Sequence, residues 1–254
     1  MRNKIKEALL AGKPVLGLSI MIPSPHLVEM AGNMGFEWVL IDCEHGSISL
    51  ETAELMIMAA EVSNTTPIVR PPKNDPEIIL QYMDRGAMGI QAPHVANARQ
   101  AEEIVAAVKY HPLGSRSLAV GTRSAHYGFK RNIKEYAQEV NRETLVCVQI
   151  EDREGLEHIT PIANVAGVDV VFLGPTDLSQ SLGYPGEVQH PVVQEALQQA
   201  FSAIHQTGKT SGTAGNFENA VIRLNQGVGY YYTHLTTLLA RSSSELFTSL
   251  RSPV

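Results

Sequence analysis

Short apolar runs recur along the chain, and segments with helical spacing separate most of them. The runs lie at 15–20, 38–42, 67–70, 88–92, 145–150, 169–173, 209–213 and 228–233, and 209–213 is the weakest. Between them, 50–62 and 97–109 carry apolar residues at intervals of three and four, which is typical of amphipathic helices. Strands that alternate with helices predict a parallel sheet with right-handed crossovers.

Eight such units in 254 residues predict an α/β fold, a closed (β/α)8 barrel that forms a single domain over 1–254. The alternative is an open doubly wound sheet, which usually carries a Gly-rich phosphate loop after its first strand. Here that place holds MIPSPHLVEM, and the only GxG, at 227–229, opens the last predicted strand instead of a helix. The pattern therefore favours the barrel.

Composition excludes several classes of protein. A net charge of −6 with 18% charged residues gives no support for a nucleic-acid partner. Cys43 and Cys147 are far apart and form no CxxC pair, so neither a disulfide framework nor a cysteine zinc site is indicated. Lys13 and Pro14 interrupt the N-terminal apolar residues, and no run reaches the roughly 18 residues of a membrane helix. We expect a cytoplasmic protein without a membrane partner.

Polar residues stand where several predicted strands end. In a barrel these ends meet on one rim, which is where active sites lie. The residues are Asp42, Glu44 and His45 after the second run, Arg70 after the third, Gln149 and Glu151 after the fifth, and Gly174 to Asp177 after the sixth. An acid, a base, a cation and several carboxylates on one rim predict an active site.

Glu151 and Asp177 follow consecutive strands, so their carboxylates could meet around a metal ion. Two carboxylates without cysteine or paired histidines suit a hard divalent ion such as Mg²⁺ or Mn²⁺. The alternative is that both residues cap the helices that follow them, EGLEHI and LSQSLG. The other polar residues expected on the same rim favour the metal interpretation.

The remaining rim residues suit proton transfer and anion binding. His45 is the natural general base, because imidazole ordinarily titrates near neutral pH, and Asp42 is placed to orient it. Both could instead satisfy the strand end as polar structural residues. Arg70 could stabilise negative charge on a substrate oxygen, or lie on the surface beside Pro71. Gly174, at the mouth of a helix, could help to hold a carboxylate.

The segment 111–128 has little helical periodicity and interrupts the alternation of strands and helices. Loops of this length in a compact domain tend to be functional or disordered. Arg116, Arg123 and Tyr127 would allow it to hold an anion or to close over a ligand. Packing at a subunit interface is the alternative.

Four motifs together resemble the HpcH/HpaI aldolases, the metal-dependent class II pyruvate aldolases related to macrophomate synthase. They are IDCEHG, IVRPPKND, VQIEDREGLEHI and VFLGPTDLSQSLG, and they occur in the family's order along most of the chain. The resemblance implies a barrel of the phosphoenolpyruvate/pyruvate type. It also implies a homo-oligomer, commonly a hexamer with its last helix exchanged, and a reversible reaction between a 2-oxo acid and an aldehyde through a pyruvate enolate.

The resemblance also implies roles for individual residues. Glu151 and Asp177 look like ligands of Mg²⁺, Mn²⁺ or Co²⁺, and Arg70 looks like the cation that stabilises the enolate. His45 with Asp42 resembles the base machinery. The pyruvate site would comprise Gln149, Gly174, Pro175 and Thr176, and Asp84, in YMDRGA, matches a further catalytic aspartate.

The chain departs from the family's pattern at three places that flank the acceptor side of the pocket. It has Gly114-Ser115-Arg116-Ser117 where relatives often have G-x-R-G, and Thr233-His234-Leu235-Thr236 where they tend to have Gly-x-Asp-Thr. A tryptophan of some relatives is missing near Ser19. These departures leave the aldehyde partner open.

Three other functional interpretations compete with the metal-dependent aldolase. A citrate-synthase-like Claisen condensation of oxaloacetate with acetyl-CoA could use the same enolate site. A non-catalytic barrel is possible because a fold hosts many functions. A Schiff-base aldolase would need a desolvated lysine at the rim, whereas Lys209 opens the weak seventh run and points to the opposite end.

Overall fold

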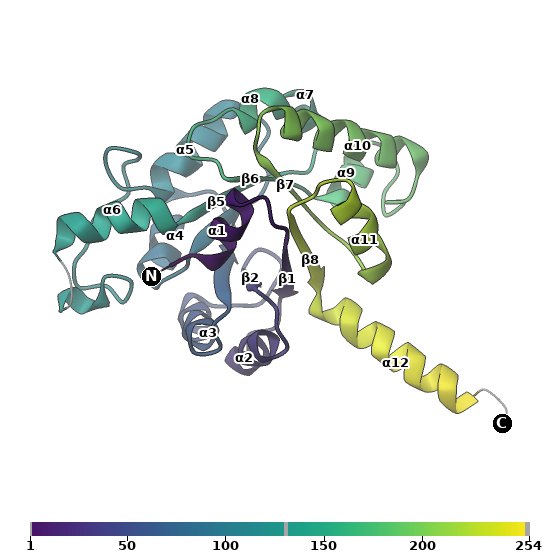
Figure 1. Cartoon of the computed structure of the whole chain (residues 1–254), viewed down its shortest axis with the longest axis horizontal. Coiled ribbons are helices and arrows are strands. Elements are labelled where there is room, and N and C mark those ends of the chain that lie inside the picture. The colour runs from purple at the N-terminus through teal and green to yellow at the C-terminus, as the bar shows by residue number, and fades with distance from the viewer. Residues whose placement is uncertain (1, 130–131, 252–254) are drawn as a thin grey trace.

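Eight parallel strands close into a barrel in the computed structural model of the chain, which describes residues 2–129 and 132–251 (Figure 1). The strands are β1 (Val15–Ile20), β2 (Trp38–Asp42), β3 (Thr66–Arg70), β4 (Gly89–Ala92), β5 (Leu145–Ile150), β6 (Val170–Leu173), β7 (Thr210–Ala214) and β8 (Tyr230–His234). Each strand pairs with the next, and β8 pairs with β1 to close the barrel. The predicted (β/α)8 barrel is confirmed.

Aromatic side chains fill the interior of the barrel below the rim. Trp38 stacks on Tyr230 with ring centroids 4.0 Å apart, and Phe172 stacks on Tyr232 at 5.2 Å. A Cβ atom on Gly17 would lie 2.2 Å from the Trp38 ring, so β1 needs glycine at this point for the indole to fit. The interior of the barrel is therefore a packed core, and a ligand would bind at the rim.

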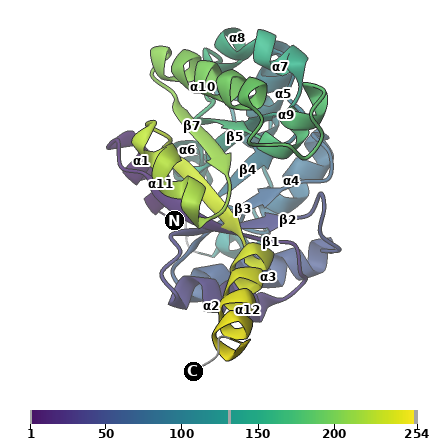
Figure 2. The same ribbon diagram turned by 90° about the vertical axis from the view of Figure 1, so that its right-hand side faces the viewer.

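Helices form the outer layer of the barrel (Figures 1 and 2). The described residues form the helices α1 (Lys4–Leu10), α2 (Pro25–Asn33), α3 (Leu50–Val62), α4 (Pro76–Asp84), α5 (Ala98–Val108), α6 (Ile133–Glu143), α7 (Arg153–Glu157), α8 (Ile159–Ala163), α9 (Pro175–Ser181), α10 (Pro191–Gln206), α11 (Phe217–Asn225) and α12 (Leu235–Arg251), with one 3-10 turn, η1 (His126–Gly128), and α12 alone leaves the layer. The helix predicted at 50–62 is α3 with the same bounds, because Ser49 caps it by accepting the Thr52 N–H. Throughout the described ranges, no helix has the length and apolar character needed to cross a membrane.

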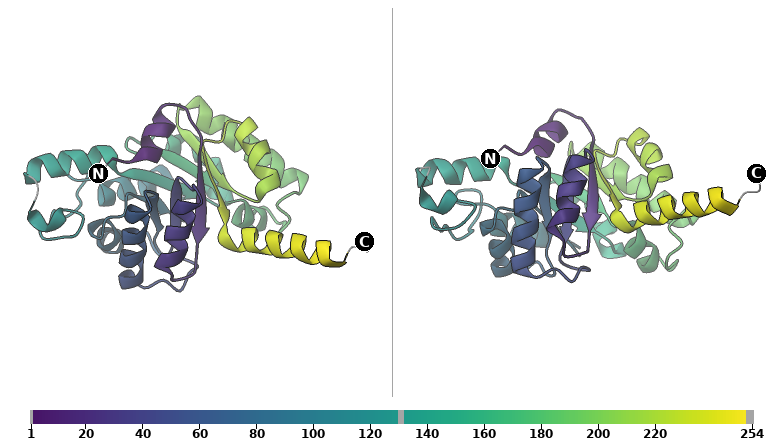
Figure 3. Two further views of the ribbon diagram at one scale, coloured as in Figure 1. Left: turned by 60° about the horizontal axis from the view of Figure 1, so that its bottom comes forward. Right: turned by 90° about the horizontal axis from the view of Figure 1, so that it is seen from below.

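Helix α12 extends away from the barrel as a single arm (Figures 1 and 3). Three of its leucines, Leu239, Leu246 and Leu250, are 55%, 58% and 73% exposed. An amphipathic helix normally packs its apolar face against other elements. This arm instead offers apolar side chains to solvent.

The end of the barrel opposite the rim, called here the N-terminal end, buries Lys109 and partly buries Lys6. Lys109 Nζ donates to the carbonyls of Asn141 (2.9 Å) and Thr144 (2.6 Å). Lys6 Nζ donates to the same Thr144 carbonyl (2.8 Å) and to Asp169 (3.0 Å). Burial, reinforced by the charge of Lys6, lowers the pKa of Lys109 to about 7.

Residues 111–128 also lie at the N-terminal end. Arg116 donates to Asp84 at 2.6 Å, and Arg123 pairs with Glu61 at the end of α3. Residues 111–128 therefore do not close over a ligand at the rim of the same chain, as one of the predictions had it. The alternative of a subunit interface stays a prediction.

Candidate active site

A cavity of about 530 Å³ opens at the rim, where the carboxyl ends of several strands meet. Its lining comprises His45, Arg70, Gln149, Phe172, Gly174, Pro175, Thr176, Asp177, Val188, Gln189, Ala214, Gly215, Asn216, Asn219, Tyr232, His234 and Thr237. Seven of the predicted site residues are among them. The strand ends thus bring together side chains that lie more than a hundred positions apart in the sequence.

A buried ion pair joins Asp42 and Arg70 on one side of this rim pocket. The two residues are direct partners in the β2–β3 pairing, and they are 0% and 4% exposed. Arg70 donates from Nε to Oδ1 at 3.0 Å and from Nη2 to Oδ2 at 2.5 Å. Burial alone would raise the pKa of Asp42, but the hydrogen bonds and charge of Arg70 outweigh it and lower that pKa. Both groups are therefore held in their charged forms.

His45 lies at the mouth of the pocket, with a side chain that is 56% exposed. Its backbone N–H donates to Asp42 Oδ1 at 3.2 Å, while its ring Nε2 lies 3.6 Å from Glu44 Oε2. Asp42 thus contacts the backbone of His45 and commits its carboxylate to Arg70. The expected orientation of the imidazole by Asp42 differs from this geometry, in which Glu44 is the carboxylate nearest the ring.

Glu44 and His94 link the two sides of the rim. Glu44 is 3.2 Å from Arg70 Nε and 2.8 Å from His94 Nε2. The other ring nitrogen of His94 lies 2.9 Å from Glu151 Oε1, and its backbone N–H donates to the same oxygen at 2.7 Å. Glu44 therefore belongs to a polar network that supports the rim. His94 bridges the two carboxylates, Glu44 and Glu151.

Glu151 is buried on the other side of the rim and receives hydrogen bonds at both oxygens. It is 5% exposed, and Gln149 Nε2 donates to its Oε2 at 2.6 Å. Gln149 in turn accepts from Gln91 at 2.6 Å, which fixes its amide in the barrel interior. Burial raises the pKa of Glu151, although the hydrogen bond from Gln149 and the charge of His94 oppose that shift. A positive charge nearby would relieve the cost of keeping this carboxylate ionised.

The N-terminus of α9 forms the wall next to Glu151. Gly174 is its N-cap residue, and Thr176 and Asp177 in its first turn are exposed to the cavity. First-turn N–H groups have no partner inside a helix, and Pro175 lacks an N–H, so Thr176 and Asp177 supply the backbone donors here. This wall thus combines hydrogen-bond donors with the Asp177 carboxylate.

Glu151 and Asp177 offer the donor atoms that a hard cation prefers. A Cβ atom on Gly174 would lie only 3.1 Å from Glu151 Oε2, so the glycine keeps space beside that oxygen. Across residues 2–129 and 132–251, no group of three or more His, Cys, Asp or Glu side chains is arranged around a possible metal position. A divalent ion here would take two carboxylates and complete its shell with water and substrate oxygens, which suits Mg²⁺ or Mn²⁺.

Asp84 and Lys209 lie away from the rim pocket. Asp84 ends α4 at the N-terminal end, where its side chain is 16% exposed and bound to Arg116. Lys209 precedes β7 and donates to the Val168 carbonyl at 2.7 Å, as expected for a lysine at that end. Lys109, whose pKa is lowered in the way a Schiff-base lysine requires, is at the same end. The geometry therefore gives the Schiff-base route no support from these two lysines.

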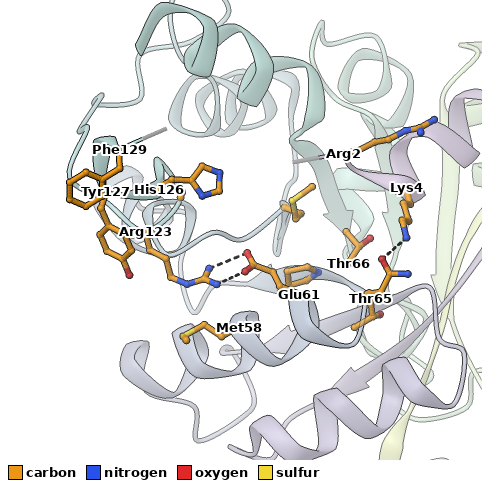
Figure 4. A pocket seen from close by; sticks show the side chains of 14 residues that line it. Arg2, Lys4, Met58, Glu61, Thr65, Thr66, Arg123, His126, Tyr127 and Phe129 are labelled. Carbon is orange, nitrogen blue, oxygen red and sulfur yellow. Dashed lines mark hydrogen bonds and ion pairs between the residues drawn. The ribbon is translucent and has the colours of Figure 1, made fainter. Parts of the chain in front are cut away.

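A larger cavity, of about 670 Å³, lies at the N-terminal end between α3, the start of β3 and residues 123–129 (Figure 4). Figure 4 shows Arg123 directed at Glu61, and Lys4 Nζ donates to Asn64 Oδ1. These cations are already paired within the chain. Size alone therefore does not identify the functional site, and the polar groups directed into the rim pocket do.

Known proteins are similar to this chain over almost its whole length. The sequence pattern of the HpcH/HpaI aldolase/citrate lyase family matches residues 17–226. A 4-hydroxy-2-oxo-heptane-1,7-dioate aldolase from Escherichia coli is 39% identical over 248 residues, which cover 97% of this chain and 94% of that one. An HpcH/HpaI aldolase/citrate lyase family protein from Burkholderia cenocepacia J2315 has a TM-score of 0.93 at 27% identity, with 98% and 100% of the chains covered. The citrate synthase SbnG has a TM-score of 0.86 at 31% identity, with 97% of each chain covered.

Proposed function

This chain belongs to the HpcH/HpaI aldolase/citrate lyase family and is a carbon–carbon lyase, and from that premise we propose that its rim pocket makes or cleaves the C–C bond of a 4-hydroxy-2-oxo acid through a pyruvate enolate. The observation that carries the proposal is Arg70. It is a permanently charged, nearly fully buried guanidinium that lines the pocket and is held by two carboxylates. Such a fixed cation suits the stabilisation of an oxyanion.

Pyruvate would bind between β5 and α9. Its carboxylate is expected at the N–H groups of Thr176 and Asp177, with Gly174 and Pro175 shaping the wall, and its 2-oxo group would lie near Gln149. The amide of Gln149 is fixed by Gln91 and Glu151, so little side-chain entropy is lost when a substrate binds. The site would thus be organised before pyruvate arrives.

Arg70 would stabilise the negative charge that develops on the 2-oxo oxygen as the enolate forms. Because Asp42 and Glu44 fix the guanidinium, no reorganisation is needed at the moment of reaction. His45, at the mouth of the pocket, would accept the proton from the pyruvate methyl group or from the aldol hydroxyl. Glu44 is the nearest carboxylate that would stabilise the imidazolium formed in this way.

A divalent cation, Mg²⁺, Mn²⁺ or Co²⁺, is part of the proposal, with Glu151 and Asp177 as its protein ligands. The ion would supply Lewis-acid polarisation of the 2-oxo group. The space beside Glu151 Oε2 and the raised pKa of that carboxyl both support a cation at this point. Gln149, which donates to Glu151 Oε2, would orient the ligand.

A second candidate function, a Claisen condensation of oxaloacetate with acetyl-CoA, is favoured by the similarity to the citrate synthase SbnG. In that reaction Arg70 would stabilise the negative charge on the 2-oxo oxygen of oxaloacetate as the enolate of acetyl-CoA adds to it. The higher identity to an aldolase, 39% against 31%, places the aldolase first.

We further propose a homo-oligomer, with a hexamer as the family resemblance implies. The exposed leucines of α12 support exchange of this arm between subunits, because a second copy would bury Leu239, Leu246 and Leu250. Asp84 lies at the N-terminal end, so a part in catalysis would require the rim of a neighbouring subunit. Comparing the sedimentation of the wild type with that of Leu246→Ser would test the exchange.

A cytoplasmic location of the protein also stays a prediction.

Cleavage of a 4-hydroxy-2-oxo acid is the experiment that tests the proposed function. With 4-hydroxy-2-oxo-heptane-1,7-dioate and Mn²⁺, the enzyme should release pyruvate, which lactate dehydrogenase with NADH detects. A parallel assay should follow thiol release from acetyl-CoA in the presence of oxaloacetate. Thiol release without pyruvate formation would replace the aldolase by the condensation.

A further inference from the structure

The ring of His94 stands between two carboxylates of the rim, one from each side of the site. Its Nδ1 lies 2.9 Å from Glu151 Oε1, and its Nε2 lies 2.8 Å from Glu44 Oε1. Ionised carboxylate oxygens only accept hydrogen bonds, and each ring nitrogen can carry the hydrogen that one of them needs. The imidazole can therefore donate to both carboxylates at once, although its side chain is 65% exposed.

The backbone of His94 approaches the same carboxylate as Nδ1. Its N–H donates to Glu151 Oε1 at 2.7 Å, so this oxygen meets both the main chain and the ring of one residue. His94 has φ 54°, in the left-handed region that residues other than glycine seldom occupy. Sparsely populated backbone conformations gather at functional sites. Here the conformation brings two donors of His94 to a single oxygen of Glu151.

These contacts distinguish the two oxygens of Glu151. Each oxygen of an ionised carboxylate has about two lone-pair sites. The two donors of His94 occupy those of Oε1, whereas within the described ranges Oε2 accepts a single hydrogen bond, from Gln149 Nε2 at 2.6 Å. The space that Gly174 keeps also lies beside Oε2, because a Cβ atom there would be 3.1 Å from this oxygen. A cation would therefore meet Glu151 at Oε2 alone.

The other ring nitrogen of His94 contacts the carboxylate that supports Arg70. While Glu44 Oε1 faces this nitrogen, Oε2 lies 3.2 Å from Arg70 Nε. The same Oε2 is 3.6 Å from His45 Nε2. A contact that fixes one oxygen of a carboxylate also limits where the other can lie. The His94 ring thus orients Glu44 toward the groups proposed to form and stabilise the enolate.

We propose that His94 is a positioning residue with two separate tasks: through Nδ1 it presents Glu151 Oε2 to the divalent ion, and through Nε2 it holds Glu44 against Arg70. This inference rests on the proposed function, which supplies the ion and the enolate. His94 itself would touch neither the ion nor pyruvate. Because the two tasks use different ring nitrogens, they can be removed one at a time.

Glutamine in place of His94 keeps the contact to Glu44 and removes the one to Glu151, because its amide nitrogen takes the place of Nε2. His94→Gln should weaken Mn²⁺ binding by about tenfold or more, as changes to the partners of metal ligands do. Calorimetry on the protein without substrate measures this affinity. The accompanying loss of pyruvate methyl-proton exchange should be recovered for the most part by excess Mn²⁺.

Asparagine should give the opposite pattern, because its amide nitrogen takes the place of Nδ1. His94→Asn should bind Mn²⁺ much as the wild type does, since the contact to Glu151 remains. Its rate of pyruvate exchange at saturating Mn²⁺ should fall by about tenfold or more, because Glu44 loses its orientation. Asparagine adopts a left-handed backbone more readily than most residues, so the fold should tolerate this change.

Glycine removes both contacts of the ring and adopts a positive φ without strain. His94→Gly should therefore lose Mn²⁺ affinity and exchange rate together. His158→Gln and His158→Asn are the matched controls, because His158 is exposed at the C-terminal end of α7 and does not line the rim pocket. Both controls should match the wild type in the two measurements.

Equal changes of Mn²⁺ affinity in His94→Gln and His94→Asn would overturn the division of tasks between the two nitrogens. Wild-type Mn²⁺ affinity in His94→Gly would overturn the role toward Glu151. Either result, with exchange intact in the wild type, would leave the proposed aldolase function standing. A wild type that neither binds Mn²⁺ nor exchanges pyruvate protons would overturn the proposed function itself, and this inference with it.

Discussion

The rim and the N-terminal end of this barrel both bury charged groups, but they satisfy them differently. At the N-terminal end, Lys109 donates to two main-chain carbonyls, and Lys6 donates to one carbonyl and to Asp169. The hydrogen bonds of both ammonium groups are thus made within the fold. At the rim, Asp42 and Glu44 share the buried Arg70, and Glu151 is bound to His94 and Gln149 beside a cavity. The comparison teaches that buried charge indicates function where it faces a cavity and remains in excess.

The largest effect expected at the rim comes from Glu151→Gln. The change removes a proposed ligand charge and keeps the size of the side chain, so Mn²⁺ binding and pyruvate proton exchange should be abolished. Thermal stability should be retained, because the variant no longer buries a carboxylate whose ionised form burial disfavours. Glu154→Gln, at an exposed position in α7, is the matched control. Normal Mn²⁺ affinity in Glu151→Gln, measured by calorimetry, would remove Glu151 as a ligand.

Arg70→Ala should lower the rate of pyruvate exchange by at least about a hundredfold, the scale of losing an oxyanion donor. It should also destabilise the fold by about 3–5 kcal/mol, because Asp42 would be left buried and unpaired. The double variant Asp42→Asn with Arg70→Met should regain much of that stability in urea unfolding without regaining exchange. A mild loss of exchange in Arg70→Ala would mean that another group stabilises the enolate.

Lys109 at the N-terminal end should affect stability and leave catalysis alone. Its pKa is about 7 in the fold and about 10.5 in the unfolded chain, so between these values the unfolded chain binds the extra proton. Raising the pH from 7 therefore stabilises the fold, by up to about 1.4 kcal/mol per pH unit for this group. Below pH 7 the contribution is constant and unfavourable.

The difference in unfolding free energy between wild type and Lys109→Met isolates this contribution, since other groups titrate alike in both. That difference should move in favour of the wild type as the pH rises from 7 to 8.5. Lys109→Met should keep pyruvate exchange near the wild-type rate. A large loss of exchange would break the contrast between the two ends of the barrel.

The smallest effect is expected from Gly174→Ala. The added Cβ atom would meet Glu151 Oε2 at 3.1 Å and Gln149 Nε2 at 3.3 Å, which is tight but can be relieved by small shifts. The KM for pyruvate should rise a few-fold, because the added methyl group narrows the proposed pyruvate site. Steady-state kinetics would show it, and an unchanged KM would indicate that pyruvate binds elsewhere in the pocket.

Most of the fold could be predicted from the sequence. Buried parallel strands appear in it as continuous apolar runs, and amphipathic helices appear as apolar residues at intervals of three and four. Even the weak run at 209–213 is a strand, Thr210–Ala214, which neighbouring strands hold despite its small polar residues. The last run, predicted at 228–233, is the strand Tyr230–His234, which begins two residues later and ends one residue later than predicted. His234 belongs to β8, and its side chain therefore points into the barrel.

The rim residues could be grouped from the strand ends, but their partners could not. Asp42 pairs with Arg70 because the β2–β3 register sets them side by side, and this register depends on the closed barrel. His94 bridges Glu44 and Glu151 from a backbone with φ 54°, a conformation uncommon for residues other than glycine. No pattern in QAPH indicates it. The aldolase resemblance itself is confirmed by the match over 17–226.

The most direct test of the central claim is the exchange of pyruvate methyl protons in D₂O, followed by NMR with Mg²⁺ or Mn²⁺ and again with EDTA. It requires the enolate half of the reaction alone. The account predicts exchange that depends on the metal, disappears on chelation and is lost in Arg70→Ala. Exchange that persists in EDTA, or its absence with every divalent ion, would contradict a metal-assisted pyruvate enolate at this rim.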